Sequence, residues 1–397
     1  MTKILISAFV ACLLSSVCFG QTWSTISADV LIDMNTSTPG TAITTAILNA
    51  GTVSSVCTVG SANCNYSSAG SGFQVGANQG TCSNLGPVQM NGTGGTLFPA
   101  NSLNYNNLSH DDSSNGSLGP IATFGAGTHP NVRMTWCFTS GLPKENGGFL
   151  SDIMMMESSG ATQYFDAQLE DYCPPTATNV YGLGLENRSG PGGIQHPTCI
   201  AVPPATGTTQ PTYYVTMNWD MANGVGTEWV FTAQGTLVGH TYLPEVTPAY
   251  AQTRIFSNEG ASNTGTRSEY QNIMFDFSTS APSGTVSVVQ NSPTVTWVSG
   301  SQFVAGPLWG QSQWGGYMYF GAPNSCTNSS GGTINIACPS VMYPISSCQS
   351  DAVCTLTTNY TGASGTVAYA AELPMFWVSE SGSTTVQPPT NVHATAQ

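Results

Sequence analysis

The stretch from Thr212 to Gly239 constrains the fold more than any other part of the chain. Its first segment alternates two kinds of side chain, the period-2 pattern of a β-strand with two different faces, with one face carrying Tyr213, Val215, Met217 and Trp219. Asp220–Gly226 supplies the asparagine and glycines of a hairpin loop. A second aromatic strand follows, and Gln234-Gly235 predicts a tight turn into a short third strand, Thr236–Val238. This meander indicates an all-β protein.

The composition agrees with that fold class. Only 7% of the residues are charged, while 40% are hydrophobic and 15 Tyr, 15 Phe and 8 Trp are present, enough for large cores. The 44 glycines and 24 prolines predict many turns. We therefore expect an ordered extracellular β-protein with long loops.

The N-terminus has the three parts of a secretory signal peptide. Lys3 provides the positive charge, Ile4–Val17 the apolar segment, and Cys18-Phe19-Gly20 a cleavage site before Gln21. The apolar segment is too short to span a bilayer, and no later segment is longer. The sequence predicts an exported chain without a membrane span, secreted or held at the cell surface.

The net charge argues against nucleic acid as a partner, and the cysteine content favours an oxidising compartment. Without the signal peptide, five basic residues remain against 20 acidic ones, a formal charge of −15 that repels nucleic acid. Ten cysteines remain and contain no C-x-x-C pair, so disulfides are expected rather than zinc. Short loops predict the pairs Cys326–Cys338 and Cys348–Cys354, and the pairing of the other six stays open: Cys57, Cys64, Cys82, Cys137, Cys173 and Cys199.

Further alternating segments predict the rest of a β-sandwich. Phe149–Glu157 and Thr162–Asp171 are expected to pair through Ser158-Ser159-Gly160, and Cys173–Pro211 is expected to be an irregular insertion. Thr41–Ala50 is the only helix expected in the mature chain. The other predicted sandwich strands are Ala28–Met34, Val132–Phe138 and Gln271–Ser278.

A second small β-domain is predicted after the boundary at Ser280–Gly284. Its six expected strands are Thr294–Val298, Gly316–Phe320, Ile334–Ala337, Val341–Ile345, Cys354–Thr358 and Thr366–Ala371. The frame TVTWVSGSQF … LW … LTTNYTG resembles small β-barrel adaptor modules of secreted and phage tail-type proteins. The end, from Gln387-Pro388-Pro389, resembles the opening of a fibronectin III domain and is expected to be a linker or tail.

The meander, an aromatic strand followed by one that ends at a tight glycine turn, resembles the late strands of concanavalin A-like (laminin G-like) jelly-roll domains. The resemblance implies a jelly-roll β-sandwich. We therefore expect a signal peptide over residues 1–20, the sandwich over 21–280, a disulfide-stapled β-domain over 281–385 and a proline-led tail over 386–397.

The strongest candidate for chemistry is Asp166-Ala167-Gln168-Leu169-Glu170. Alternation places Asp166, Gln168 and Glu170 on one strand face, opposite Phe165, Ala167 and Leu169. Retaining glycosidases of the concanavalin A-like fold carry E-x-D-x-E there, so the resemblance implies Asp166 as nucleophile and Glu170 as acid/base. Two positions depart from that motif, because the first residue is Asp and the central one is Gln. A solvated polar strand face is the alternative interpretation.

Two weaker candidates concern ligands. Asp111, Ser113 and Asn115 offer oxygens at alternate positions before Gly116, like the start of a calcium loop, but Ala122 stands where the bidentate Glu belongs. Ca²⁺ is thus the one cofactor that the sequence suggests. Trp219 and Trp229 are candidates for stacking on sugar rings, against a simpler role in the core.

Three hypotheses follow from these patterns. The first is a non-catalytic binding or adhesion protein that recognises a glycan or a cell-surface polymer. The second is a retaining glycoside hydrolase that uses Asp166 and Glu170, and the third is a structural component of a surface or appendage. An acidic cleft around Asp166 favours the hydrolase, whereas a flat polar face there favours binding or structure.

Overall fold

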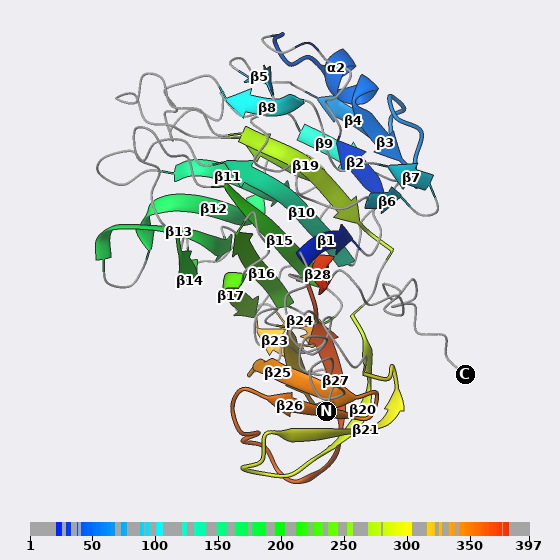
Figure 1. The fold of residues 1–397 in the computed structure, drawn as a ribbon, viewed down its shortest axis with the longest axis vertical. Coiled ribbons are helices and arrows are strands. Elements are labelled where there is room, and N and C mark those ends of the chain that lie inside the picture. The colour runs from blue at the N-terminus through cyan, green and yellow to red at the C-terminus, as the bar shows by residue number, and fades with distance from the viewer. Residues whose placement is uncertain are drawn as a thin grey trace, which may run out of the picture.

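The computed structural model describes most of the strands and the turns between some of them. The described residues are 21–25, 29–32, 38, 41–67, 73–77, 88–90, 93–95, 101–105, 121–124, 131–139, 149–156, 163–173, 177–187, 195–202, 212–220, 223, 225–232, 237–244, 252–256, 269–278, 281–303, 316–321, 325–327, 333–337, 341–374 and 376–380. Figure 1 shows two large sheets and, beyond one end of them, a smaller barrel.

The larger sheet has nine strands and contains the predicted meander. Its main path runs β17-β16-β15-β10-β19-β2-β3, with β8 beside β19 and β5 beside β8. The meander is confirmed, although its third strand is longer than predicted. The strands are β2 (Val30–Ile32), β3 (Thr52–Ser54), β5 (Phe73–Ala77), β8 (Asn101–Tyr105), β10 (Asn131–Thr139), β15 (Thr212–Asp220), β16 (Val225–Thr232), β17 (Leu237–Pro244) and β19 (Glu269–Asp276).

The second sheet has seven antiparallel strands in the order β14-β13-β12-β11-β18-β9-β4. The predicted pair of β11 with β12 is confirmed. The prediction that Cys173–Pro211 is irregular is wrong, because it supplies β13 and β14; the glycines of β13 and a proline in β14 hide the alternation. The strands are β4 (Cys64–Ser67), β9 (Ile121–Phe124), β11 (Phe149–Met156), β12 (Gln163–Cys173), β13 (Ala177–Asn187), β14 (Gln195–Ala201) and β18 (Gln252–Phe256).

The two sheets pack face to face and form a β-sandwich. Phe124 of β9 packs on Phe275 of β19, with ring centroids 5.1 Å apart. At the other end, a Cβ on Gly239 of β17 would lie 2.6 Å from Ile200 Cγ2, so glycine permits the close approach of β14. These contacts bury apolar side chains from both sheets, the main source of sandwich stability. The all-β sandwich is thereby confirmed.

A short helix caps one edge of the sandwich. The helix α2 (Thr45–Ala50) begins after Thr44, whose hydroxyl accepts a hydrogen bond from Ile47 N at 3.2 Å. Leu48 is its buried residue. The helix is confirmed within the predicted range but is shorter, because threonines and isoleucines are weak helix formers.

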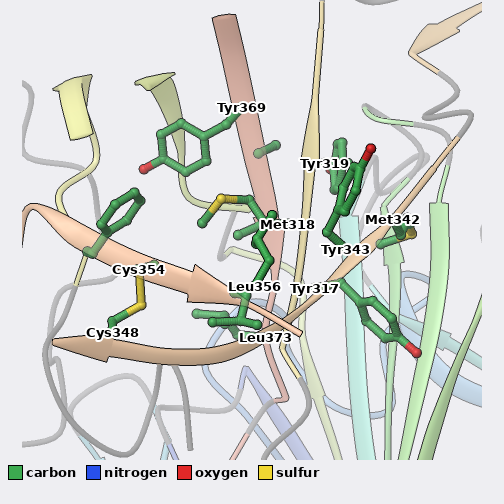
Figure 2. Close-up of a cluster of buried hydrophobic side chains, with 14 of the residues drawn as sticks. Tyr317, Met318, Tyr319, Met342, Tyr343, Cys348, Cys354, Leu356, Tyr369 and Leu373 are labelled. Atoms are coloured by element: carbon green, nitrogen blue, oxygen red, sulfur yellow. A yellow bond between two sulfur atoms is a disulfide. The ribbon is translucent and has the colours of Figure 1, made fainter. Parts of the chain in front are cut away.

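The C-terminal part forms a closed six-stranded barrel in the order β20-β21-β26-β25-β22-β27. Met318, Leu356 and Leu373 belong to its buried core, and a disulfide joins Cys348 of β25 to Cys354 of β26, as the short loop predicts (Figure 2). The strands are β20 (Ser283–Val288), β21 (Thr294–Gly300), β22 (Tyr317–Phe320), β25 (Tyr343–Ser350), β26 (Val353–Leu356) and β27 (Gly365–Glu372).

One predicted barrel strand pairs elsewhere. The segment predicted over Ile334–Ala337 is β24 (Thr333–Ala337), but it forms a separate hairpin with β23 (Ser325–Thr327). Cys326 lies in β23, while Cys338 lies outside the described residues, so the predicted pair of these two cysteines stays a prediction. A short hairpin of β6 (Val88–Met90) and β7 (Thr93–Gly95) completes the described loop region of the sandwich.

Two strands from opposite ends of the chain also pair. β1 (Gln21–Thr25) runs antiparallel to β28 (Phe376–Glu380), the strand that follows the barrel. In the view of Figure 1, this ribbon overlaps the end of the sandwich that is nearer the barrel. Neither strand was predicted, because pairing across the whole chain leaves no local signal. The chain thus connects sandwich and barrel twice, through the segment after β19 and through this ribbon.

The barrel packs directly on the meander. Tyr317 of β22 lies against Trp229 of β16, with ring centroids 6.2 Å apart, and one continuous apolar cluster includes residues of both units. Every residue from Tyr213 to Asp220 is therefore buried. The two faces predicted for this strand exist, but neither is open to water, because the second sheet covers one and the barrel covers the other.

Candidate functional site

The predicted catalytic motif lies on β12, in the interior of the seven-stranded sheet. Asp166 is opposite Met154 of β11 and Glu186 of β13 in the backbone register. Gln168 is opposite Asp152 and Gly184. Since directly opposite residues share a face of an antiparallel pair, these positions belong to one face with Glu170. We call this face of β11, β12 and β13 the β12 surface.

The register also identifies which side of the sheet this is. Leu169 pairs with Leu183, and Leu183 pairs with Ile200, which is buried and contacts Gly239 of the other sheet. Leu169 therefore belongs to the side that faces the sandwich core. Because alternate residues of a strand belong to opposite faces, Asp166, Gln168 and Glu170 are on the side away from the core.

An independent route across the sheet gives the same assignment. Phe124 contacts Phe275 of the nine-stranded sheet, so Ala122, two residues earlier in β9, is on the core side. Ala122 pairs with Thr253, Thr253 with Met155, and Met155 with Phe165 of β12. Phe165 is thus a core position, as the sequence predicts, and Asp166 is on the opposite side.

The β12 surface brings together four acidic positions that are scattered in the sequence: Asp152, Asp166, Glu170 and Glu186. Gly182 and Gly184 occupy the neighbouring positions on β13, and Arg254 lies across β11 opposite Met154. Because glycine has no side chain, such positions in a strand allow a ligand or another backbone to approach closely.

The register brings a third acidic position next to the predicted pair. Asp166 and Glu170 are separated by about 13 Å of strand rise, whereas Glu186 occupies the backbone position directly opposite Asp166. Glu186 was missed because its segment was predicted to be irregular; the alternation of Leu183 and Leu185 was the available signal.

The tryptophans predicted to stack on sugars are not on a surface. Trp219 and Trp229 both have 0% exposure. Trp219 alternates with Asn218 and belongs to the sandwich core, while Trp229 packs under the barrel against Tyr317. Their burial corrects the stacking role and supports the simpler interpretation as core residues.

The predicted calcium ligands Asp111, Ser113 and Asn115 lie outside the described residues. Among the residues whose side chains the structure describes, no group of three or more His, Cys, Asp and Glu side chains is placed to hold a metal ion. Of the first six cysteines, Cys57 and Cys64 form a disulfide.

A buried polar cluster lies where the barrel meets the meander. The Asn218 side-chain amide of β15 donates to Glu372 Oε2 at 3.1 Å and to the Leu373 carbonyl at 2.7 Å. The Tyr319 hydroxyl of β22 donates to Glu372 Oε1 at 3.2 Å. Burial, and then the neighbouring charge of Asp220, raise the pKa of Glu372 well above its usual value.

A second buried network lies where the chain leaves the sandwich. Arg133 of β10 forms an ion pair with Asp276 of β19, with Nε 3.1 Å from Oδ2. The Asp29 carboxylate accepts hydrogen bonds from Phe277 N at 2.7 Å and Ser278 N at 3.0 Å, although burial raises its pKa. These contacts fix the end of β19 and the two residues that follow it, where the chain leaves the sandwich.

Comparison with known proteins finds structural likeness but no sequence family. No family model and no curated protein matches the chain. An alginate lyase from Alteromonas sp. 272 is 10% identical, with a TM-score of 0.31, over 45% of this chain and 89% of its own. Lectin I from Ulex europaeus, solved with the methyl glycoside of α-L-fucose, is 12% identical with a TM-score of 0.33, over 53% and 94%.

A third solved structure matches a longer part of the chain. The CBM2 module of the evolved Dit protein of Lactobacillus casei BL23 phage J-1 is 11% identical, with a TM-score of 0.35, over 65% of this chain and 96% of the module. At this level of similarity, the three matches define neither a family nor a ligand. In the described part of the chain, no helix has the length and apolar character needed to cross a membrane.

Proposed function

We propose that this chain is an exported, non-catalytic binding or adhesion protein that recognises a glycan through the β12 surface. The observation that carries the proposal is the register of β11, β12 and β13, which gathers Asp152, Asp166, Gln168, Glu170 and Glu186 on the side of the sheet away from the core. Polar positions at the centre of a sheet, beside glycines, suit a ligand rich in hydroxyl groups.

The charge of this surface narrows the class of glycan. The β12 surface contains four acidic positions and, on the neighbouring strand β18, one arginine position, Arg254. Carboxylates accept hydrogen bonds from sugar hydroxyls but repel carboxylate and sulfate groups. We therefore expect a neutral glycan to bind better than a polyanionic one such as a uronate polymer.

The cysteines support an extracellular setting. Two disulfides, Cys57–Cys64 and Cys348–Cys354, occur among the described residues, and such bonds persist in oxidising compartments. They fit the predicted signal peptide and a secreted or cell-surface location.

The alternative is a retaining glycoside hydrolase, in which Asp166 is the nucleophile and Glu170 the acid/base. The register favours this alternative specifically, because Glu186 occupies the position directly opposite Asp166 and a retaining enzyme needs two carboxyls close together. A purely structural role in a surface assembly is the remaining hypothesis, motivated by the small barrel.

A binding panel tests the proposal. Neutral β-glucans, galactans, a uronate polymer and a sulfated polymer are each titrated with wild-type protein and with Gln168→Ala. We expect binding to a neutral glycan that Gln168→Ala weakens at least tenfold, whereas the control Asn359→Ala, exposed on the barrel, binds normally. If Gln168→Ala binds as strongly as wild type, the binding site does not include the β12 surface. If no neutral glycan binds at all, the proposed function is contradicted.

A further inference from the structure

The polar residues between sandwich and barrel form a specific connection that the glycan proposal does not use. We call Asn218, Asp220, Tyr319 and Glu372 the interface cluster. Their exposed fractions are 3%, 3%, 5% and 3%. Asn218 and Asp220 come from β15, Tyr319 from β22 and Glu372 from β27, so the cluster exists only when the barrel sits on the nine-stranded sheet. Buried groups of this kind are costly unless each has a hydrogen-bond partner.

The cluster buries two carboxyls together. Asp220 is two residues from Asn218 on the same face of β15, and Asn218 donates to Glu372. Two carboxylates buried near each other repel, which favours the protonated form of one of them. Asn223 donates to Asp220 through its backbone N at 2.9 Å and its side-chain Nδ2 at 2.6 Å. Those two donors favour the ionised form of Asp220. Glu372 also accepts from Asn218 and Tyr319, but burial and the charge of Asp220 outweigh these donors and raise its pKa, so we place the proton on Glu372.

We propose that a proton on Glu372 acts as a latch: it strengthens the docking of the barrel on the sandwich, and its loss weakens the docking. If Asp220 and Glu372 were both ionised in the docked arrangement, two negative charges would be buried together. Separation of the barrel from β15 gives both carboxylates access to solvent.

The direction of the pH effect follows from the raised pKa of Glu372. In an undocked barrel its carboxyl would titrate near the usual value of about 4.3, whereas burial and Asp220 raise the pKa in the docked state. The stabilisation of docking by this proton is therefore complete below the usual pKa of a glutamate, and it is lost as the pH rises towards the raised pKa of Glu372. Over that window, the docking equilibrium constant falls about tenfold for each pH unit.

The other titratable groups at this interface act differently. The Arg133 guanidinium, on the same sheet face, forms an ion pair with Asp276. Tyr317 and Tyr319 have raised pKa values because they are buried, so both stay neutral. Tyr242 of β17 packs against Tyr317. His240 hydrogen-bonds to Tyr317, and burial lowers its pKa, so its effect has the opposite sign and is confined to acid below about pH 6.5.

Hydrogen exchange on the full chain tests the latch. Amide exchange of β15 and β22, corrected for the pH dependence of intrinsic exchange, is measured from about pH 5 to pH 9, upward from the usual pKa of a glutamate. The proteins compared are wild type, Glu372→Gln and the control Asp351→Asn, an exposed barrel carboxyl. The amide mimics a protonated carboxyl. We expect protection in wild type and in the control to fall with pH and protection in Glu372→Gln to stay constant.

Two results would overturn the proposal: a parallel loss of protection in wild type and Glu372→Gln, or pH-independent protection in both. Circular dichroism checks that each variant folds. If Glu372→Gln does not fold, Glu372→Met provides the same test, because it removes the group that titrates; an unchanged pH dependence in that variant would equally contradict the latch.

Discussion

The side-chain amide of Asn218 lies 3.1 Å from Glu372 Oε2, across 154 residues of sequence, and joins the sandwich to the barrel. The same amide nitrogen also donates to the Leu373 carbonyl at 2.7 Å. With Trp229 packed on Tyr317 beside it, this contact makes the two units one packed body. The barrel thus covers the outer face of the meander, so the β12 surface of the seven-stranded sheet remains as the candidate binding face.

Replacement of Asn218 tests the contribution of this contact. Asn218→Ala leaves the Leu373 carbonyl and one oxygen of Glu372 with a missing donor in a buried site, so we expect a loss of about 1–3 kcal/mol in the free energy of unfolding. Urea denaturation measures it. Asn359→Ala, at an exposed position, should change stability by less than about 0.5 kcal/mol; equal effects of the two variants would contradict the role of Asn218.

The ion pair of Arg133 and Asp276 makes a second prediction. Arg133→Met leaves the buried Asp276 carboxylate without its cation, and we expect a loss of about 3–5 kcal/mol. Asp276→Asn in the same chain should restore part of that loss, since it removes the uncompensated charge. The measurement is again urea denaturation of the single and double variants. Strictly additive losses would show that the two residues do not act as a pair.

His240 predicts a pH dependence on the acid side. Burial lowers its pKa, so the unfolded chain binds the proton more tightly than the folded chain. Its contribution is complete above about pH 6.5 and is lost as pH falls towards the lowered pKa. In a Glu372→Gln background, thermal unfolding midpoints should fall between pH 6.5 and 5. The additional change His240→Gln should flatten that part of the curve, and an equally steep acid limb in its presence would refute the assignment.

If the predicted signal peptide is removed, ten cysteines remain, and we predict that the mature chain has no free thiol. Pairing is the simplest role of cysteines in an exported chain, and two disulfides within short loops are present among the described residues. Thiol labelling of the denatured, unreduced protein should give no signal, with reduced protein as the positive control. Two or more labelled cysteines per chain would contradict the prediction.

The sequence predicts the local parts of this fold and misses the parts that depend on distant partners. The meander, the β11–β12 pair and the barrel strands from β21 onwards carry their own alternation and turn residues, whereas β20 (Ser283–Val288) was not predicted. β13 is hidden because Gly182 and Gly184 remove the side chains that would mark its outer face. β1 pairs with β28 at the far end of the chain, a contact that no local pattern encodes.

The same limit applies to the candidate site. Alternation along β12 is enough to place Asp166, Gln168 and Glu170 on one face, and the register agrees. Which side that face is on depends on Ile200 and Phe124, which contact the other sheet. The burial of Trp219 and Trp229 was likewise beyond prediction, because it requires knowing that the second sheet covers one side of the meander and the barrel covers the other.

The most direct test of the central claim, glycan recognition without cleavage, is a reducing-end assay on a glycan that the protein has been shown to bind. We predict that wild-type protein releases no new reducing ends during prolonged incubation, and that Glu170→Gln and Glu186→Gln behave identically to it. Release of reducing ends that disappears in Glu170→Gln or Glu186→Gln would contradict non-catalytic binding and establish the hydrolase alternative.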